Sequence, residues 1–78
     1  MTFKIVRSWS NGSVDYTSTQ KLESKVAVHA HNRFLVTVCH RIAAFGSCLI
    51  SAEIKDDTVR IESTTHGVEI WRFVEDED

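Results

Sequence analysis

One stretch of the 78-residue chain, "VAVHAHNRFLVTVCHRIAAFG" at positions 26–46, holds most of the side chains that could bind a metal ion or act as a nucleophile or base. It contains three of the four histidines and one of the two cysteines, namely His29, His31, His40 and Cys39. A zinc site uses thiolate and imidazole ligands at about 2.0 to 2.3 Å, commonly in paired CxxC or HxxxH spacings. Neither spacing occurs in the stretch, so no sequence motif for a metal site is present.

The secondary structure of this stretch decides whether its polar side chains converge. As a hairpin, "KVAVHA" and "FLVTVC" would be strands joined at positions 31–33, and His29 and His31 would share a face. A single helix is favoured, because apolar residues recur at the helical period and Gly46 follows as a C-terminal stop. The stripe consists of Ala27, His31, Phe34, Leu35, Val38, Ile42 and Phe45.

In a helix, these side chains form neither a metal site nor a catalytic site. His29 and His40 lie roughly 16 Å apart along the axis, while His31 points to the apolar side. Cys39 and His40 are neighbours in sequence, but the side chains of helical neighbours diverge by about 100°. We therefore expect no metal, no cofactor, no small-molecule substrate and no enzymatic activity.

The first part of the chain is predicted to form a hairpin and then to enter the helix. The strands "FKIVRSW" and "VDYTS" are joined through Asn11 and Gly12, which accept the positive φ angles of a tight turn. Thr17 and Gln20 have the spacing of a capping box, which predicts a helix start near Ser18.

After Gly46 the apolar period changes to two, as is typical of strands. The segments "CLISAEI", "TVRIEST" and "VEIWRFV" are separated by the turn-like "KDD" and "THG", which predicts a three-stranded antiparallel meander. The expected fold class is α+β: a single antiparallel sheet in ββαβββ order with one long helix packed on one face. We expect one domain over residues 1–78 with a short acidic C-terminal tail at 75–78.

Charge is divided unevenly between the two halves of the chain. Residues 1–45 hold six Lys and Arg against two acids, whereas residues 46–78 hold three against nine, giving balances of +4 and −6. Such asymmetry is informative about partners rather than about fold.

Composition also excludes several classes of protein. A chain with 42% hydrophobic and 26% charged residues and no proline is neither collagen-like, disordered nor transmembrane. The N-terminus lacks the apolar core of a signal peptide, so we expect the protein to stay in the cytoplasm. Two cysteines are too few for a disulfide scaffold, and both are expected to be free.

The last strand offers a candidate binding surface in one of two possible orientations. Two sets of residues alternate along it: Val68, Ile70 and Val74 on one face, and Glu69, Trp71 and Phe73 on the other. If the first set faces the helix, the two aromatic residues lie on the open face, flanked by charges as interface anchors are. In the opposite orientation both rings belong to the core.

In size, in the order hairpin, helix, meander, and in its close "VEIWRFVEDED", the chain resembles the small proteins with which phages and mobile elements inhibit host defence, anti-CRISPR proteins in particular. The resemblance implies a non-enzymatic inhibitor that binds a larger, nucleic-acid-handling complex in the host cytoplasm. The expected partner is a protein with a basic surface. The expected contacts are the acids and aromatics of the second half: Glu53, Asp56, Asp57, Glu62, Glu69, Trp71, Phe73, Glu75, Asp76, Glu77 and Asp78.

A small nucleic-acid-binding domain is the alternative function. The outer side of the predicted helix carries Lys25, Arg33 and Arg41, which could follow a phosphate backbone. The acidic overall charge and the missing RNA-binding signatures favour a protein partner instead. Neither the partner's identity nor the oligomeric state follows from the sequence.

Overall fold

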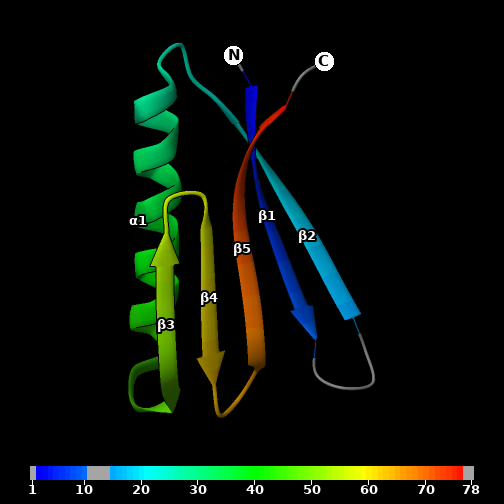
Figure 1. Ribbon diagram of the computed structural model, residues 1–78, viewed down its shortest axis with the longest axis vertical. Coiled ribbons are helices and arrows are strands. Elements are labelled where there is room, and N and C mark those ends of the chain that lie inside the picture. Colours follow the sequence, from blue (N-terminus) through cyan, green and yellow to red (C-terminus); the bar gives the residue numbers. More distant parts are fainter. Residues whose placement is uncertain (1, 11–14, 77–78) are drawn as a thin grey trace.

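The structure, a computed structural model, describes residues 2–10 and 15–76. Along these residues the elements are β1 (Thr2–Ser10), β2 (Asp15–Glu23), α1 (Ala27–Phe45), a 3-10 turn η1 (Gly46–Cys48), β3 (Leu49–Lys55), β4 (Thr58–Ser63) and β5 (Gly67–Asp76) (Figure 1). The expected α+β class, with one antiparallel sheet and one helix, is confirmed.

The strands are not arranged in the sheet as they follow one another in the chain. Their order is β2-β1-β5-β4-β3, so the first strand lies beside the last. In that junction Ile5 is in register with Phe73, and all neighbouring strands are antiparallel. The expected ββαβββ order does not specify this arrangement, because the pairing of β1 with β5 is a long-range contact that no local turn dictates.

The predicted helix start near Ser18 is wrong, because residues 15–23 form β2. This strand pairs with β1 over its whole length, from Thr2 opposite Glu23 to Ser10 opposite Asp15. The capping-box spacing loses to this pairing, since Tyr and Thr favour strands and β1 otherwise lacks a partner on that side. The predicted turn at Asn11 and Gly12 lies outside the described residues.

The helical prediction for the histidine-rich stretch is confirmed, and the hairpin alternative is wrong. Helix α1 begins after Val26, which makes no side-chain cap, and its last residue is Phe45, followed by Gly46 as the C-terminal cap. That glycine has φ of 54°, a backbone conformation that side chains disfavour, and it therefore terminates the helix as expected. Among the described residues, no helix combines the length and apolarity needed to cross a membrane.

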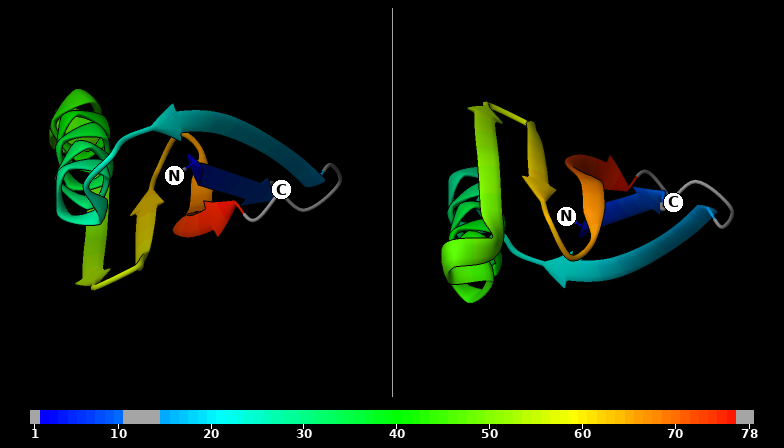
Figure 2. Two further views of the ribbon diagram at one scale, coloured as in Figure 1. Left: turned by 90° about the horizontal axis from the view of Figure 1, so that it is seen from above. Right: turned by 90° about the horizontal axis from the view of Figure 1, so that it is seen from below.

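The sheet is strongly curved, and the helix lies on its concave side (Figure 2). Aromatic residues form the contact: the ring of Phe34 on α1 lies 5.6 Å from that of Phe73, which stacks on Phe3 at 5.2 Å. The buried apolar side chains come from the helix and four strands: Phe3, Ile5, Leu22, Ala30, Phe34, Val38, Phe45, Val59, Ile61 and Trp71. Burial of such side chains contributes about 1.5 to 3 kcal/mol each and is the main source of stability.

Candidate functional site

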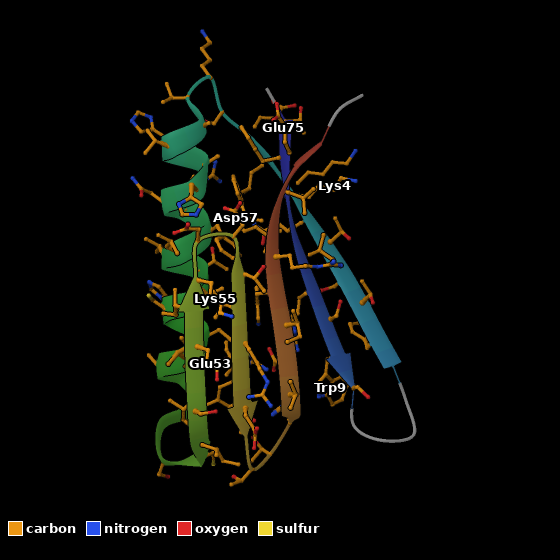
Figure 3. All side chains as sticks on the ribbon, viewed as in Figure 1. Lys4, Trp9, Glu53, Lys55, Asp57 and Glu75 are labelled. Carbon is orange, nitrogen blue, oxygen red and sulfur yellow. The ribbon has the colours of Figure 1, made fainter. Side chains whose placement is uncertain are left out.

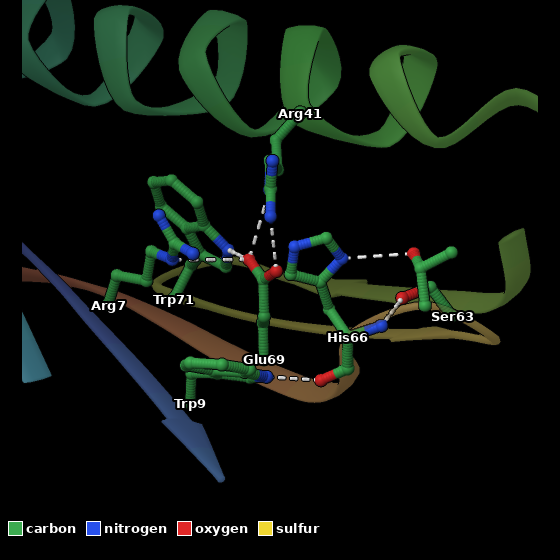
Figure 4. Close-up of polar contacts among 8 residues, drawn as sticks. Arg7, Trp9, Arg41, Ser63, His66, Glu69 and Trp71 are labelled. Carbon is green, nitrogen blue, oxygen red and sulfur yellow. Dashed lines mark hydrogen bonds and ion pairs between the residues drawn. The ribbon is translucent and has the colours of Figure 1, made fainter. Parts of the chain in front are cut away.

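A fully buried carboxylate, that of Glu69 on β5, lies between the sheet and the helix (Figure 4). Its Oε2 accepts a hydrogen bond from Nη2 of Arg41 on α1 at 2.6 Å, and its Oε1 accepts one from Arg41 Nε at 3.2 Å. Trp71 Nε1 donates to Oε1 at 3.0 Å. Nε of Arg7 on β1 forms an ion pair with the same oxygen at 3.3 Å, without hydrogen-bond geometry. Together, Arg7, Arg41, Glu69 and Trp71 are called the Glu69 cluster.

The surroundings of Glu69 keep its carboxylate ionised. Burial raises the pKa of Glu69, but hydrogen bonds from Arg41 and Trp71 and the charges of Arg41 and Arg7 lower it by more, so the pKa lies below its ordinary value. A carboxylate held by two guanidinium groups has no proton to donate near neutral pH and is a weak base. The Glu69 cluster is therefore suited to join α1 to β1 and β5, and unsuited to acid or base catalysis.

The same cluster settles the orientation of β5 that the sequence left open. Trp71 is 8% exposed, Glu69 is 0% exposed, and Phe73 packs against the core. The orientation that would present Trp71 and Phe73 as interface anchors is therefore wrong. The physical reason is that Arg7 and Arg41 neutralise Glu69, so the strand face that carries this acid next to Trp71 and Phe73 can be buried.

The acids expected to form one surface are distributed over several parts of the molecule (Figure 3). Glu53 and Glu62 lie on β3 and β4, whereas Glu75 lies near the end of β5. Glu62 is paired with Arg60 at 2.9 Å. Because Arg60 lies beside Glu62 and because Glu69 is buried, the acids of the second half do not form one acidic patch.

The remaining acids of the set lie at two turns or ends. Asp56 and Asp57 connect β3 to β4 and are exposed. Asp76 ends β5, and Glu77 and Asp78 lie outside the described residues.

His31 connects the helix to the turn between β3 and β4. Its Nε2 lies 2.5 Å from the carbonyl oxygen of Asp56 and 3.4 Å from Oδ1 of Asp57. Its ring also packs edge-on against Phe73, with centroids 5.3 Å apart. The sequence predicted that His31 faces the apolar side of the helix. In the structure its side chain is half-buried and connects the β3–β4 turn to the helix.

The other candidate ligands are dispersed. His29 and His40 are exposed on the helix, Cys39 is exposed, and Cys48 is half-buried; both cysteines are free. Within residues 2–10 and 15–76, no group of three His, Cys, Asp or Glu side chains converges as metal ligands do.

The basic residues proposed for nucleic-acid binding do not act as a group of three. Lys25 and Arg33 are exposed, but the guanidinium of Arg41 is bound to Glu69 and stacks on the ring of Phe45 at 4.4 Å. Of the three expected cations, only Arg33 is an exposed residue of α1, because Lys25 lies in the connection before the helix and Arg41 is bound to Glu69.

The convex face of the sheet, on the side away from the helix, has a regular side-chain arrangement. The pairing registers place one row across it as Thr17, Ser8, Ile70, Arg60 and Glu53, and a second row as Thr19, Val6, Arg72, Thr58 and Lys55. None of the described elements covers this side (Figure 2). Ile70 thus lies near the centre of this face, where its side chain is half-buried.

Apolar and charged side chains alternate on the convex face. Its apolar members lie on the neighbouring strands β1 and β5 and are Val6, Val68, Ile70 and Val74. Around them lie cations and acids: Lys4, Lys21, Lys55, Arg60, Arg72, Glu23, Glu53 and Glu62. A shallow hollow of 190 Å³ beside Ile70 is bordered by both charge signs, from Arg60 and Lys55 to Glu53.

Sequence reasoning did not identify this apolar cluster, because it left open whether Val68, Ile70 and Val74 face the helix or the open side of the sheet. The missed signal was the alternation of β1, in which Lys4 and Val6 share a face that excludes Phe3 and Ile5. Since β1 pairs with β5, the face opposite Ile5 must also be the face of Ile70.

Comparisons with known proteins add no assignment. No protein-family model matches the chain, and neither the curated proteins nor the solved structures gave a match.

Proposed function

We propose that the protein is a non-enzymatic interaction module that binds a protein partner through the convex face. The observation that carries the proposal is the uncovered apolar cluster around Ile70, bordered by charges of both signs. Protein interfaces have this organisation, with an apolar centre and a polar rim. The described residues line shallow, open hollows rather than an enclosed chamber, which favours binding over catalysis.

The mixed charge of the convex face favours a protein over a nucleic acid. Glu53 and Glu62 alternate with Arg60 and Lys55, so acids would meet a phosphate backbone wherever the cations did. A protein surface that carries an apolar ridge between acidic and basic side chains fits this face better. The partner is thus one of mixed charge, instead of the uniformly basic one expected from the charge of the second half.

A small module of this kind acts by occupying a surface of its partner. We propose that the protein inhibits a larger complex by binding this surface, as the resemblance to anti-CRISPR proteins implies. The nucleic-acid alternative predicts instead binding to generic duplex DNA or RNA that weakens steeply with salt.

The experiment compares wild type, Ile70→Asp and Val28→Asp as baits for proteins of the native host. Val28 is a matched control, because it is 57% exposed and lies on the helix, away from the convex face. We expect wild type and Val28→Asp to retain the same partner in stoichiometric amount and Ile70→Asp to lose it. Equal retention by all three variants, or retention of nucleic acid with a steep salt dependence, would contradict the proposal.

A further inference from the structure

Four cations lie close together on the half of the convex face where β2, β3 and β5 end. Lys4 on β1 is directly opposite Lys21 on β2 in the pairing register. Arg72 on β5 is opposite Val6, two residues along β1 from Lys4, so Lys4 and Arg72 are diagonal neighbours. Lys55 on β3 lies in the same row as Arg72 and is separated from it by strand β4. Together, Lys4, Lys21, Lys55 and Arg72 are called the cation strip.

The position of the cations within the sheet is informative about their role. Lysines on edge strands protect a sheet against pairing with another chain, which accounts for Lys21 on β2 and Lys55 on β3. Lys4 and Arg72 lie on the inner strands β1 and β5, where this protection is not needed. Like charges directly opposite each other also destabilise a sheet, and Lys4 and Lys21 are such a pair. Edge protection therefore explains only half of the cation strip.

Three of these cations have no carboxylate partner in the described part of the chain. Lys21, Lys55 and Arg72 are exposed, and none of them forms an ion pair with another of residues 2–10 and 15–76. The acids two residues away along the same edge strands are Glu23 and Glu53, which border the cation strip. Between these borders, the described residues of the convex face present positive charge only.

Aliphatic side chains lie among the cations. Val74 on β5 is opposite Lys4 and 39% exposed, and Val6 on β1 is half-buried opposite Arg72. Neighbouring strands are about 4.8 Å apart, so the cation strip extends over about 19 Å from β2 to β3. A ligand that matches this surface supplies negative charges at several points and aliphatic groups between them.

We propose that the cation strip binds an acidic segment of a protein partner, in which carboxylate side chains are mixed with aliphatic ones. The carboxylates neutralise the repulsion among the cations, and the aliphatic side chains cover Val6 and Val74. This inference rests on the proposed function, because it concerns the same face, and it assigns the acidic part of a mixed-charge partner to one half of that face. A nucleic acid fits less well, since it has no aliphatic side chains and meets Glu23 or Glu53 where it leaves the strip.

The first test measures the binding of a labelled peptide of alternating glutamate and leucine to the full chain by fluorescence anisotropy. Wild type is expected to bind this peptide more tightly than a lysine–leucine peptide, duplex DNA or single-stranded RNA. Arg72→Glu should weaken the binding at least about tenfold, because it reverses a charge within the strip. Arg33→Glu is the matched control, since it makes the same charge change at an exposed position of the helix.

Circular dichroism verifies that each variant is folded. Absence of peptide binding by wild type, equal weakening by Arg72→Glu and Arg33→Glu, or tighter binding of either nucleic acid overturns the inference.

The second test separates this inference from the proposed function. Arg72→Glu is used as a bait for proteins of the native host, beside wild type and Ile70→Asp. We expect both variants to lose the partner that wild type retains, and the glutamate–leucine peptide to release that partner from wild type. Loss by Ile70→Asp with full retention by Arg72→Glu contradicts the role of the cation strip and leaves the proposed function in place. Retention by both variants contradicts the two proposals together.

Discussion

Arg41 on the helix and Glu69 on the last strand, 28 positions apart, are joined by two hydrogen bonds of 2.6 and 3.2 Å around a carboxylate that no solvent reaches. This pair explains why the acid-bearing face of β5 is buried. It also turns a residue that the sequence assigned to a binding surface into a residue of the interior.

Replacing Glu69 by Gln should destabilise the fold. The variant leaves two guanidinium groups without their anion, and breaking a buried pair costs about 3 to 5 kcal/mol. Urea unfolding followed by circular dichroism measures the change. Glu62→Gln is the control, since its ion pair with Arg60 is partly exposed and should contribute below about 1 kcal/mol. Equal effects of the two substitutions would contradict the assigned role of Glu69.

The stability of the fold should depend on pH through the carboxylate of Glu69. Because the pKa of Glu69 is lower in the folded state, its contribution is fully present above the unfolded value and is lost as the pH falls through the folded value. The free energy of unfolding of wild type should thus decrease between neutral and strongly acidic pH by more than that of Glu69→Gln. Parallel pH profiles for the two proteins would show that another group is responsible.

Replacing Trp71 by Ala should lower stability rather than binding alone. Trp71 is 8% exposed and donates a hydrogen bond to Glu69, and removing a core tryptophan costs about 3 to 5 kcal/mol. Thermal melting of the free protein measures the loss. An unchanged melting temperature would restore the orientation in which Trp71 is an exposed anchor.

Among the described residues, Gly46 and Gly67 have positive φ angles, and they should respond differently to alanine. Gly46→Ala should cost on the order of 1 to 3 kcal/mol, because φ of 54° with ψ of −125° is strained for a residue with a Cβ atom, although that atom would meet nothing within 4 Å. Gly67→Ala should cost more, since φ is 69° and the Cβ atom would lie 3.3 Å from the carbonyl oxygen of Ser10 in the neighbouring strand. Chemical denaturation of both variants measures the order, and a larger loss at Gly46 would contradict it.

The sequence predicted the helix and the strands correctly wherever no long-range pairing opposed the local pattern. The apolar stripe from Ala27 to Phe45 and the stop at Gly46 predicted α1, and the alternation after Gly46 predicted the meander. The same reasoning failed at residues 15–23, because a capping box supplies two hydrogen bonds whereas pairing with β1 supplies a whole ladder.

Only the tertiary structure decided which strand faces are buried and which residues can bind. A strand face that carries an acid followed by two aromatic residues, as Glu69, Trp71 and Phe73 do, can point either way in an isolated strand. The burial of Glu69 is compensated by Arg41 from the helix and by Arg7 from β1. Both residues are far from Glu69 in the sequence. Local periodicity predicts that two faces alternate, but which face is buried follows from long-range contacts, namely the pairing of β5 with β1 and the charge compensation of Glu69.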